Sequence, residues 1–234
     1  MKLGILQCDS VLPEFQTKFG DYDTMLVDLF SLCDPTIEFE IYNVQIGEYP
    51  NDIHDCDAYV TTGSKASVYD ELDWIPPLKS FIRVLAKKQK KLIAICFCHQ
   101  LIAETFSGKT QASEKGWGVG VAENKILQKK PWMQPDLATL KLVVSHKDQV
   151  QILPENAELL ASSEFCPYFM YQINNTILTV QGHPEFSHDY SETLMRHRKD
   201  IIGEPTFSNA IKSLDQISDE VKFTQWMLNF INLR

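Results

Sequence analysis

The chain has 234 residues, of which 44% are hydrophobic, which suits one fairly large globular domain or at most two small ones. Its 31 acidic residues outnumber its 22 basic residues, and the resulting formal charge of −9 argues against nucleic acid or an anionic membrane as the main partner. No apolar run approaches the roughly 20 residues that span a bilayer, and the first residues lack the pattern of a signal peptide.

In the first half of the chain, short apolar strands alternate with amphipathic helices. Helices are predicted over 22–33, from 75 into the eighties and over 99–106, because apolar residues recur there at helical spacing. Strands are predicted over 3–8, 37–44, 58–62 and 92–96. This alternation is typical of an α/β domain with a mainly parallel sheet and helices on both faces.

The second half of the chain is richer in strands. They are predicted over 119–127, 140–145, 159–162, 169–173 and 176–181, and Asn174-Asn175 marks a hairpin turn between the last two. Apolar residues at helical spacing return from about residue 187 to the end. Since no repeat or linker interrupts the chain, we expect one domain over residues 1–234, with an antiparallel segment in its second half.

A cysteine lies where a buried strand turns directly into a helix, in the run 91–100. A nucleophile at such a turn is lifted out of the sheet, and the positive end of the helix dipole favours its thiolate. The backbone N–H of the following residue, Phe97, faces the oxyanion that develops during attack. Cys96 is therefore a candidate nucleophile.

A later strand delivers a histidine and, two residues on, a carboxylate: His183 and Glu185. A cysteine, a histidine and a carboxylate, each at a strand end, form the set that thiol-based nucleophilic catalysis requires. The sequence thus points to an enzyme that attacks an acyl or amide carbon. A buried structural cysteine is the main alternative for Cys96.

Two other interpretations of the cysteine turn are weaker. Cys96, Cys98 and His99 are unlike a metal site, because three neighbours on one turn converge poorly and no second ligand cluster follows; we expect no metal and no cofactor. A disulfide between the two cysteines would be strained. We expect His99 to serve packing, and Trp117 to serve either packing or the mouth of a pocket.

The turn and the later motif together resemble the class I glutamine amidotransferases of the triad type. Members carry a small-x-Cys-x-Gly-His-Gln turn and a His-Pro-Glu motif, which read here as the runs 94–100 and 183–185. Thr62-Gly63-Ser64 is similar to the glycine loop of the family, and the run 145–150 to its Ser/Asn-His-x-Asp segment. The resemblance covers roughly residues 1–190.

The resemblance implies a flavodoxin-like three-layer α/β sandwich and cleavage of a γ-glutamyl amide through a cysteinyl thioester. Cys96 would be the nucleophile, His183 the acid and base, and Glu185 the residue that orients the imidazole. Backbone N–H groups of Gly63 and Phe97 would hold the oxyanion. The glutamyl group would be held by Gln100, Ser145, His146, Lys147 and Asp148.

The chain departs from the family pattern at two positions: Cys98 stands where the family has glycine, and Lys147 where it often has Gln or Gly. Two enzymatic interpretations stay open, a hydrolase acting alone on glutamine or γ-glutamyl peptides and a protein that passes ammonia to a separate synthetase. A catalytically degenerate binding or regulatory protein, and less so a thiol redox protein, are the alternatives.

The six cysteines are spread through the chain without the spacing of a secreted disulfide framework. In a chain of this length, such cysteines are typical of free thiols in a reducing compartment. We therefore expect a cytoplasmic protein whose partners are a small γ-glutamyl substrate and, in one interpretation, an ammonia-accepting synthetase.

Overall fold

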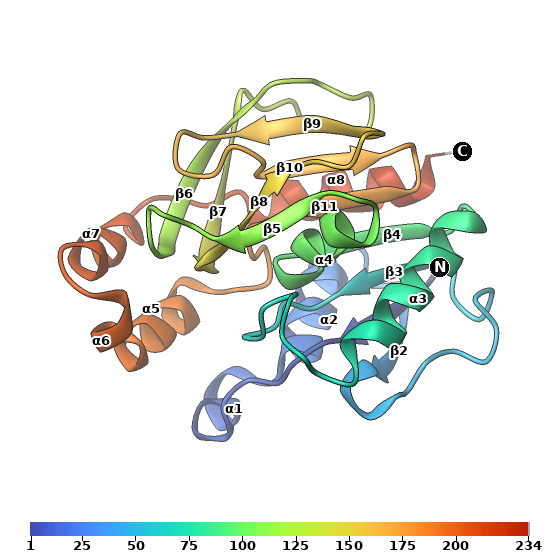
Figure 1. Ribbon diagram of the computed structural model, residues 1–234, viewed down its shortest axis with the longest axis horizontal. Helices are drawn as coiled ribbons and strands as arrows, with labels where there is room; N and C mark the ends of the chain where they lie inside the picture. Colours follow the sequence, from blue (N-terminus) through green and yellow to red (C-terminus); the bar gives the residue numbers. More distant parts are fainter. Residues whose placement is uncertain (234) are drawn as a thin grey trace.

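The computed structural model describes residues 1–233, and within them nine strands form one mixed sheet in the order β2-β1-β3-β4-β11-β10-β9-β6-β7 (Figure 1). The strands of this sheet are β1 (Lys2–Gln7), β2 (Glu38–Asn43), β3 (Ala58–Thr61), β4 (Lys91–Ile95), β6 (Gly118–Ile126), β7 (Thr139–His146), β9 (Ala157–Ser162), β10 (Met170–Ile173) and β11 (Ile177–Val180). Strands β2, β1, β3, β4 and β11 run parallel, whereas the pairs from β11 to β7 are antiparallel. The predicted antiparallel segment thus extends the same sheet.

Helices cover both faces of the parallel strands, which makes three layers. Helices α2 (Tyr22–Cys33) and α8 (Glu220–Asn232) pack on one face, and α3 (Ile75–Lys87) and α4 (Phe97–Thr105) pack on the other. Strand β4 is buried on both sides, because Ile93 faces the first layer and Leu92 the second. The predicted flavodoxin-like α/β fold is confirmed.

The remaining elements border the sheet. A group of short helices lies beside β6 and β7 (Figure 1), namely α5 (His188–His197), α6 (Lys199–Ile202) and α7 (Thr206–Ser213). Strands β5 (Lys109–Ala112) and β8 (Asp148–Ile152) pair as a separate small sheet, and the 3-10 turn η1 (Val44–Ile46) follows β2. The helices beside β6 and β7 bring Arg198 close to Ser145 of β7.

The structure corrects two local expectations. Helix α1 (Pro13–Phe19) lies between the predicted strand 3–8 and the predicted helix 22–33, where no helix was expected. None of its residues is buried, so it lacks the apolar periodicity by which helices are recognised. The pairing of β5 with β8 was also not predicted, since both strands are short and polar. The hairpin at Asn174-Asn175 is confirmed by the antiparallel pairing of β10 with β11.

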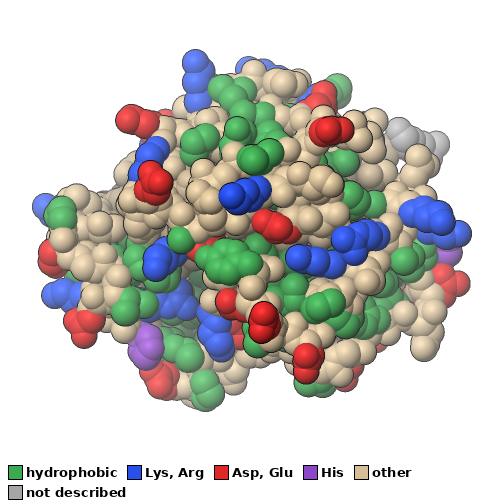
Figure 2. Space-filling view, in the orientation of Figure 1, with side chains coloured by type: hydrophobic (Ala, Val, Ile, Leu, Met, Phe, Trp, Pro, Cys, Tyr) green, Lys and Arg blue, Asp and Glu red, His purple; other side chains and the backbone are tan. Residues whose placement is uncertain are grey.

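Acidic and basic side chains are both spread over the face seen in Figure 2. No helix within residues 1–233 combines the length and the apolar composition that a membrane crossing requires. All six cysteines are unpaired, as the sequence predicts.

Candidate active site

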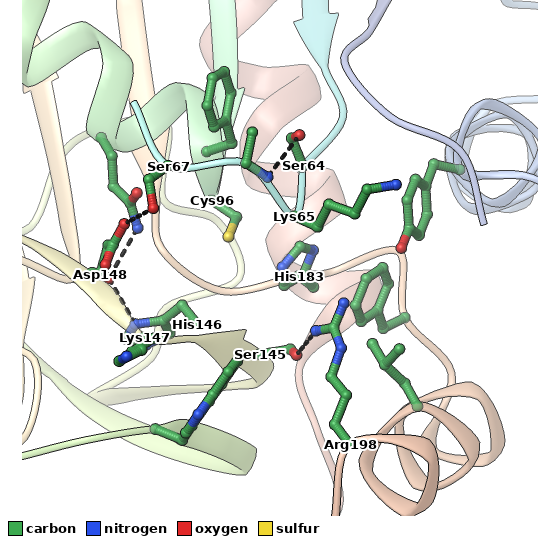
Figure 3. Close-up of a pocket in the computed structure, with 18 of the residues that line it drawn as sticks. Ser64, Lys65, Ser67, Cys96, Ser145, His146, Lys147, Asp148, His183 and Arg198 are labelled. Atoms are coloured by element: carbon green, nitrogen blue, oxygen red, sulfur yellow. Dashed lines mark hydrogen bonds between the residues drawn. The ribbon is translucent and has the colours of Figure 1, made fainter. Parts of the chain in front are cut away.

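Cys96 lies at the sharp turn between β4 and α4. Its backbone adopts φ 46° and ψ −96°, a strained conformation for a residue with a side chain. The residue is the N-cap of α4, so it lies at the positive end of the helix dipole, where the N–H groups of the first turn, beginning with Phe97, have no partner within the helix. The side chain is almost fully buried, and its sulfur points toward His183 (Figure 3). Such strain at a residue facing a pocket is a mark of functional sites.

His183 and Glu185 follow β11 and form a tight pair. The Nδ1 atom of His183 lies 2.7 Å from Oε1 of Glu185, and the backbone N–H of His183 donates to the carbonyl of Val143 at 2.8 Å. The ring of Phe186 stacks on the imidazole with centroids 3.9 Å apart and an interplanar angle of 10°. These contacts fix the ring so that its other nitrogen faces the Cys96 sulfur.

The charge state of His183 is set by opposing effects. Burial alone lowers the pKa of His183, because it removes water from the imidazolium. The neighbouring Cys96 sulfur and the Glu185 carboxylate outweigh burial and raise the pKa to about 10. The imidazole therefore carries a proton at neutral pH that it can give to a leaving group.

Gly63 follows β3 and lies against both reactive side chains. A Cβ at this position would lie 2.6 Å from Cε1 of His183 and 3.5 Å from Cβ of Cys96. Only a residue without a side chain lets the backbone approach so closely. The Gly63 backbone therefore lies directly against Cys96 and His183.

Asp9, which the sequence did not single out, anchors the loop after Gly63. Its buried carboxylate accepts hydrogen bonds from the backbone N–H of Lys65 at 2.9 Å and from Oγ of Ser64 at 3.4 Å. The Nζ atom of Lys65 pairs with the same carboxylate at 3.3 Å. The loop after Gly63 is thus fixed by a residue that follows β1, and β3 lies between β1 and the strand that leads to Cys96.

On one side of Cys96, the polar groups are bonded to one another. The Asp148 carboxylate accepts from Oγ of Ser67 at 2.6 Å and from the Tyr69 hydroxyl at 3.0 Å. Nε2 of Gln100 donates to the Asp148 carbonyl at 2.9 Å and to Oε1 of Gln181 at 3.0 Å. We call these five residues the glutamyl-side network, after the group that the resemblance of the sequence leads us to expect here.

Gln181 was not predicted, although it lies two residues before His183 in the sequence. Its Nε2 atom donates to the Cys96 sulfur at 3.5 Å, and its side chain is fully buried. It therefore connects the network directly to the sulfur. A polar residue at the end of an otherwise apolar strand was the available signal.

His146 and Lys147 differ in exposure. His146 is buried, its Nδ1 lies 3.0 Å from the Asp148 carbonyl, and burial lowers the pKa of His146 to about 4, so the ring is neutral at neutral pH. Lys147 is exposed and lines the same pocket. His99 is buried in the core, as expected for a packing role: its Nδ1 lies 2.9 Å from Oγ1 of Thr179, and burial lowers its pKa to about 3.

Cys98 occupies the position of the family glycine without straining the turn. Only Cys96 of the two has a positive φ, and the Cys98 side chain points into the core, where its sulfur lies 3.7 Å from that of Cys8. His99 points toward Thr179 instead. Because Cys96, Cys98 and His99 face three different surroundings, they do not form a metal site.

One pocket of about 350 Å³ collects the predicted residues, a size typical of small-molecule sites (Figure 3). Every predicted site residue except Glu185 lines it, namely Gly63, Cys96, Phe97, Gln100, Ser145, His146, Lys147, Asp148 and His183. Glu185 lies behind His183 as its partner. Trp117 and Arg198 also line this pocket, and Arg198 was not predicted from the sequence.

Comparison with known proteins agrees with this geometry. The family model described as Glutamine amidotransferase class-I matches residues 35–199. The chain belongs to this family. The matched range contains Cys96, His183 and Glu185, and it ends one residue after Arg198.

Relatives show how the family varies. The chain is 33% identical to "Gamma-glutamyl peptidase 4" of Arabidopsis thaliana over 75% of this chain and 72% of the relative. It is 36% identical to a glutamine-hydrolysing GMP synthase component of Pyrococcus abyssi over 48% of this chain and 61% of the relative. The fold is similar to that of a glutamine amidotransferase from Thermotoga maritima, with a TM-score of 0.76, 16% identity, and coverage of 98% and 96% of the two chains.

Proposed function

We propose that this protein hydrolyses γ-glutamyl amide bonds through a thioester on Cys96. The observation that carries the proposal is the convergence of a strained cysteine, a paired His183–Glu185 and the Gly63 backbone at one pocket. A packing role for Cys96 explains neither its strained backbone nor the buried pair of His183 and Glu185 next to it. The intact set also argues against a degenerate binding protein.

In the proposed reaction, His183 holds the proton at the start, and the thiolate of Cys96 beside it attacks the γ-carbonyl carbon. The N–H groups of Phe97 and Gly63 stabilise the oxyanion of the tetrahedral intermediate. The carbon–nitrogen bond then breaks while His183 gives its proton to the leaving nitrogen, and a glutamyl thioester remains on Cys96. Glu185 holds the imidazolium throughout.

The second half of the reaction restores the enzyme. His183 removes a proton from a water molecule as that water attacks the thioester carbonyl; the carbon–sulfur bond then breaks, glutamate is released, and the Cys96 thiolate is restored beside the protonated His183. The γ-glutamyl group is held by the glutamyl-side network, and Lys147, which lines the same pocket, pairs with its α-carboxylate. No step calls for a metal or a cofactor.

The similarity to a γ-glutamyl peptidase supports a hydrolase that acts alone on small γ-glutamyl compounds. The shorter similarity to a glutamine-hydrolysing component of GMP synthase favours a second candidate function, in which the ammonia released from glutamine passes to a separate synthetase. The two differ in the leaving group: an amino acid or peptide in the first, ammonia in the second.

Hydrolysis of glutamine and of a γ-glutamyl dipeptide tests the proposal, with glutamate release as the readout. We expect turnover by the natural protein, and a loss of about 10⁴-fold or more in Cys96→Ala. Cys33→Ala, a half-buried cysteine far from the pocket, is the matched control and should keep full activity. Equal rates in the natural protein and Cys96→Ala would contradict the proposal. Stimulation of glutamine hydrolysis by a co-purifying synthetase would favour the ammonia-supplying function.

A further inference from the structure

We propose that Arg198 determines specificity by binding a carboxylate on the leaving group. The preferred substrates are then γ-glutamyl peptides whose residue after the scissile bond carries a free carboxylate, rather than glutamine or γ-glutamyl amides. This inference rests on the proposed function and concerns the same pocket. It assigns a role to a residue outside the motifs that define the family resemblance.

The path of the proton in the proposed reaction indicates which part of the substrate lies near Arg198. His183 gives its proton to the leaving nitrogen, so the leaving group must lie next to the imidazole. Figure 3 shows Arg198 and Ser145 beside His183, while Asp148 and Lys147 lie across the pocket. Arg198 is therefore on the side of the pocket where the leaving group lies, which we call the leaving-group side.

Neighbouring residues hold the guanidinium of Arg198 without neutralising it. Its Nη1 donates to Oγ of Ser145 at 3.2 Å, and its Cζ lies 5.9 Å from the centroid of the Trp117 ring. The side chain is half-buried, and within residues 1–233 it forms no ion pair with a carboxylate. A guanidinium has five N–H donors in a planar fork, so most of them remain open to a ligand.

The other cations of the pocket are placed differently. Lys65 is already paired with Asp9 at 3.3 Å, and two thirds of its side chain is exposed. Lys147 lies beside the glutamyl-side network, where the glutamyl α-carboxylate is expected. Arg198 is thus the cation on the leaving-group side whose charge lacks a partner in the described chain.

A carboxylate suits this environment better than a neutral group. A planar carboxylate matches the fork of a guanidinium, and the pair is strengthened where water is partly excluded. Because the protein carries a net charge of −9, it repels anionic ligands in general, and the unpaired Arg198 provides a local site that attracts them. In a γ-glutamyl dipeptide, the carboxylate is separated from the leaving nitrogen only by the α-carbon, so both groups fall within this part of the pocket.

A matched pair of substrates tests the inference: γ-glutamyl-alanine and γ-glutamyl-alaninamide, which differ only in the charge of the leaving group. We expect the natural protein to prefer the acid in kcat/KM by about 10-fold or more. Arg198→Ala should lose most of this preference through a higher KM for the acid, while kcat/KM for the amide and for glutamine falls much less. Arg198→Lys should restore part of the preference.

Arg196→Ala is the matched control, because Arg196 lies on the same stretch of helices, is exposed and pairs with Glu192. It should keep the full preference for the acid. Equal kcat/KM for acid and amide in the natural protein would overturn the inference and leave the proposed function standing. A uniform loss of activity on all substrates in Arg198→Ala would also overturn it, since a structural role acts that way. No hydrolysis of any of the three substrates would overturn the proposed function itself and this inference with it.

Discussion

The two sides of the pocket are built in contrasting ways. On the glutamyl side, Asp148, Gln100 and Gln181 are bonded to one another and to the sulfur of Cys96, so their positions are fixed before any ligand arrives. On the leaving-group side, the side chain of Arg198 donates one hydrogen bond, to Ser145, and has no carboxylate partner among residues 1–233. A network whose polar groups are already hydrogen-bonded to one another suits the γ-glutamyl group, which is the same in every substrate. A cation without a partner suits the leaving group, which differs from one substrate to the next.

The contrast also follows the order of the chain. Gly63, Cys96 and His183 follow the parallel strands β3, β4 and β11, whose ends the sheet aligns at one edge. Gln100 of the glutamyl side comes from helix α4, directly after Cys96, and Asp148 from β8. Arg198 comes from the short helices beside β6 and β7. Chemistry common to a family can thus be kept by the sheet while attached helices alter what the enzyme accepts.

Of the variants that follow, a change at Glu185, the partner of His183, should have the largest effect on kcat. It should affect all substrates equally, because His183 serves both sides of the pocket. Glu185→Gln removes a negative charge that favours the imidazolium, so the pKa of His183 should fall from about 10. We expect a loss of about 10²-fold in kcat for both glutamine and γ-glutamyl-alanine. In a pH–rate profile, the alkaline limb should move to lower pH, because the proton donor is lost earlier as pH rises.

The same pair affects stability in the same direction. Since folding raises the pKa of His183 above its ordinary value of 6.5, the stabilisation is fully present below pH 6.5 and is lost as the pH rises through about 10. Denaturation midpoints of Glu185→Gln across this range should therefore depend less on pH than those of the natural protein. An unchanged alkaline limb and unchanged midpoints would contradict the assigned pairing.

Filling the space at Gly63 should damage the reaction centre on both sides equally. The added methyl of Gly63→Ala would meet Cε1 of His183 at 2.6 Å, so the imidazole must shift. Displacements of this size cost about 10²-fold in rate, and we expect such a loss in kcat for every substrate. Gly47→Ala is strained by its φ of +81° but meets nothing within 4 Å, so it controls for destabilisation by the loss of a glycine away from the pocket. Full activity in Gly63→Ala would exclude close packing of this loop against His183.

A change in the glutamyl-side network should weaken binding of all substrates alike. Asp148→Asn removes the charge that accepts from Ser67 and Tyr69 and offers an amide in its place. We expect kcat/KM to fall about 10-fold for γ-glutamyl-alanine and its amide, with their ratio preserved. The opposite pattern is expected of Arg198→Ala, so the two variants separate the two sides of the pocket. If Asp148→Asn changed the ratio of kcat/KM between γ-glutamyl-alanine and its amide, the assignment of Asp148 to the glutamyl side would be contradicted.

The smallest effect on activity is expected at Cys98. Restoring the family glycine with Cys98→Gly removes a buried side chain that contacts Cys8 and places glycine in the first turn of α4. We expect a loss of about 2 kcal/mol in the free energy of unfolding, measured by denaturant titration, and little change in kcat. A large gain in kcat would instead show that Cys98 hinders the turn.

The sequence predicted best where burial is periodic. Helix α2 and strand β4 were placed within one residue of their observed bounds, because their apolar residues follow helical spacing in one case and form a continuous run in the other. Helix α1 lacks any buried residue and could not be recognised in this way. The small β5–β8 sheet was missed for a related reason, since its strands are polar and its pairing depends on residues far apart in the chain.

Within the site, the motifs predicted the residues at the strand ends. The contacts of Asp9 with Lys65 and of Arg198 with Ser145 join residues 56 and 53 positions apart, and no local pattern reports them. Arg198 follows Leu194 by four residues, so the two share a helical face that points at the pocket, and this spacing was the available signal. Residues that set specificity were therefore harder to find than those of the reaction centre.

Covalent trapping tests the central claim most directly. The protein is incubated with 6-diazo-5-oxo-norleucine, an electrophilic analogue of glutamine, and its intact mass and peptide map are measured with and without glutamine or γ-glutamyl-alanine as competitor. The account predicts a single adduct on Cys96 that both competitors suppress, γ-glutamyl-alanine at the lower concentration. Absence of an adduct on Cys96, while a general thiol reagent still reaches that sulfur, would contradict a working γ-glutamyl site.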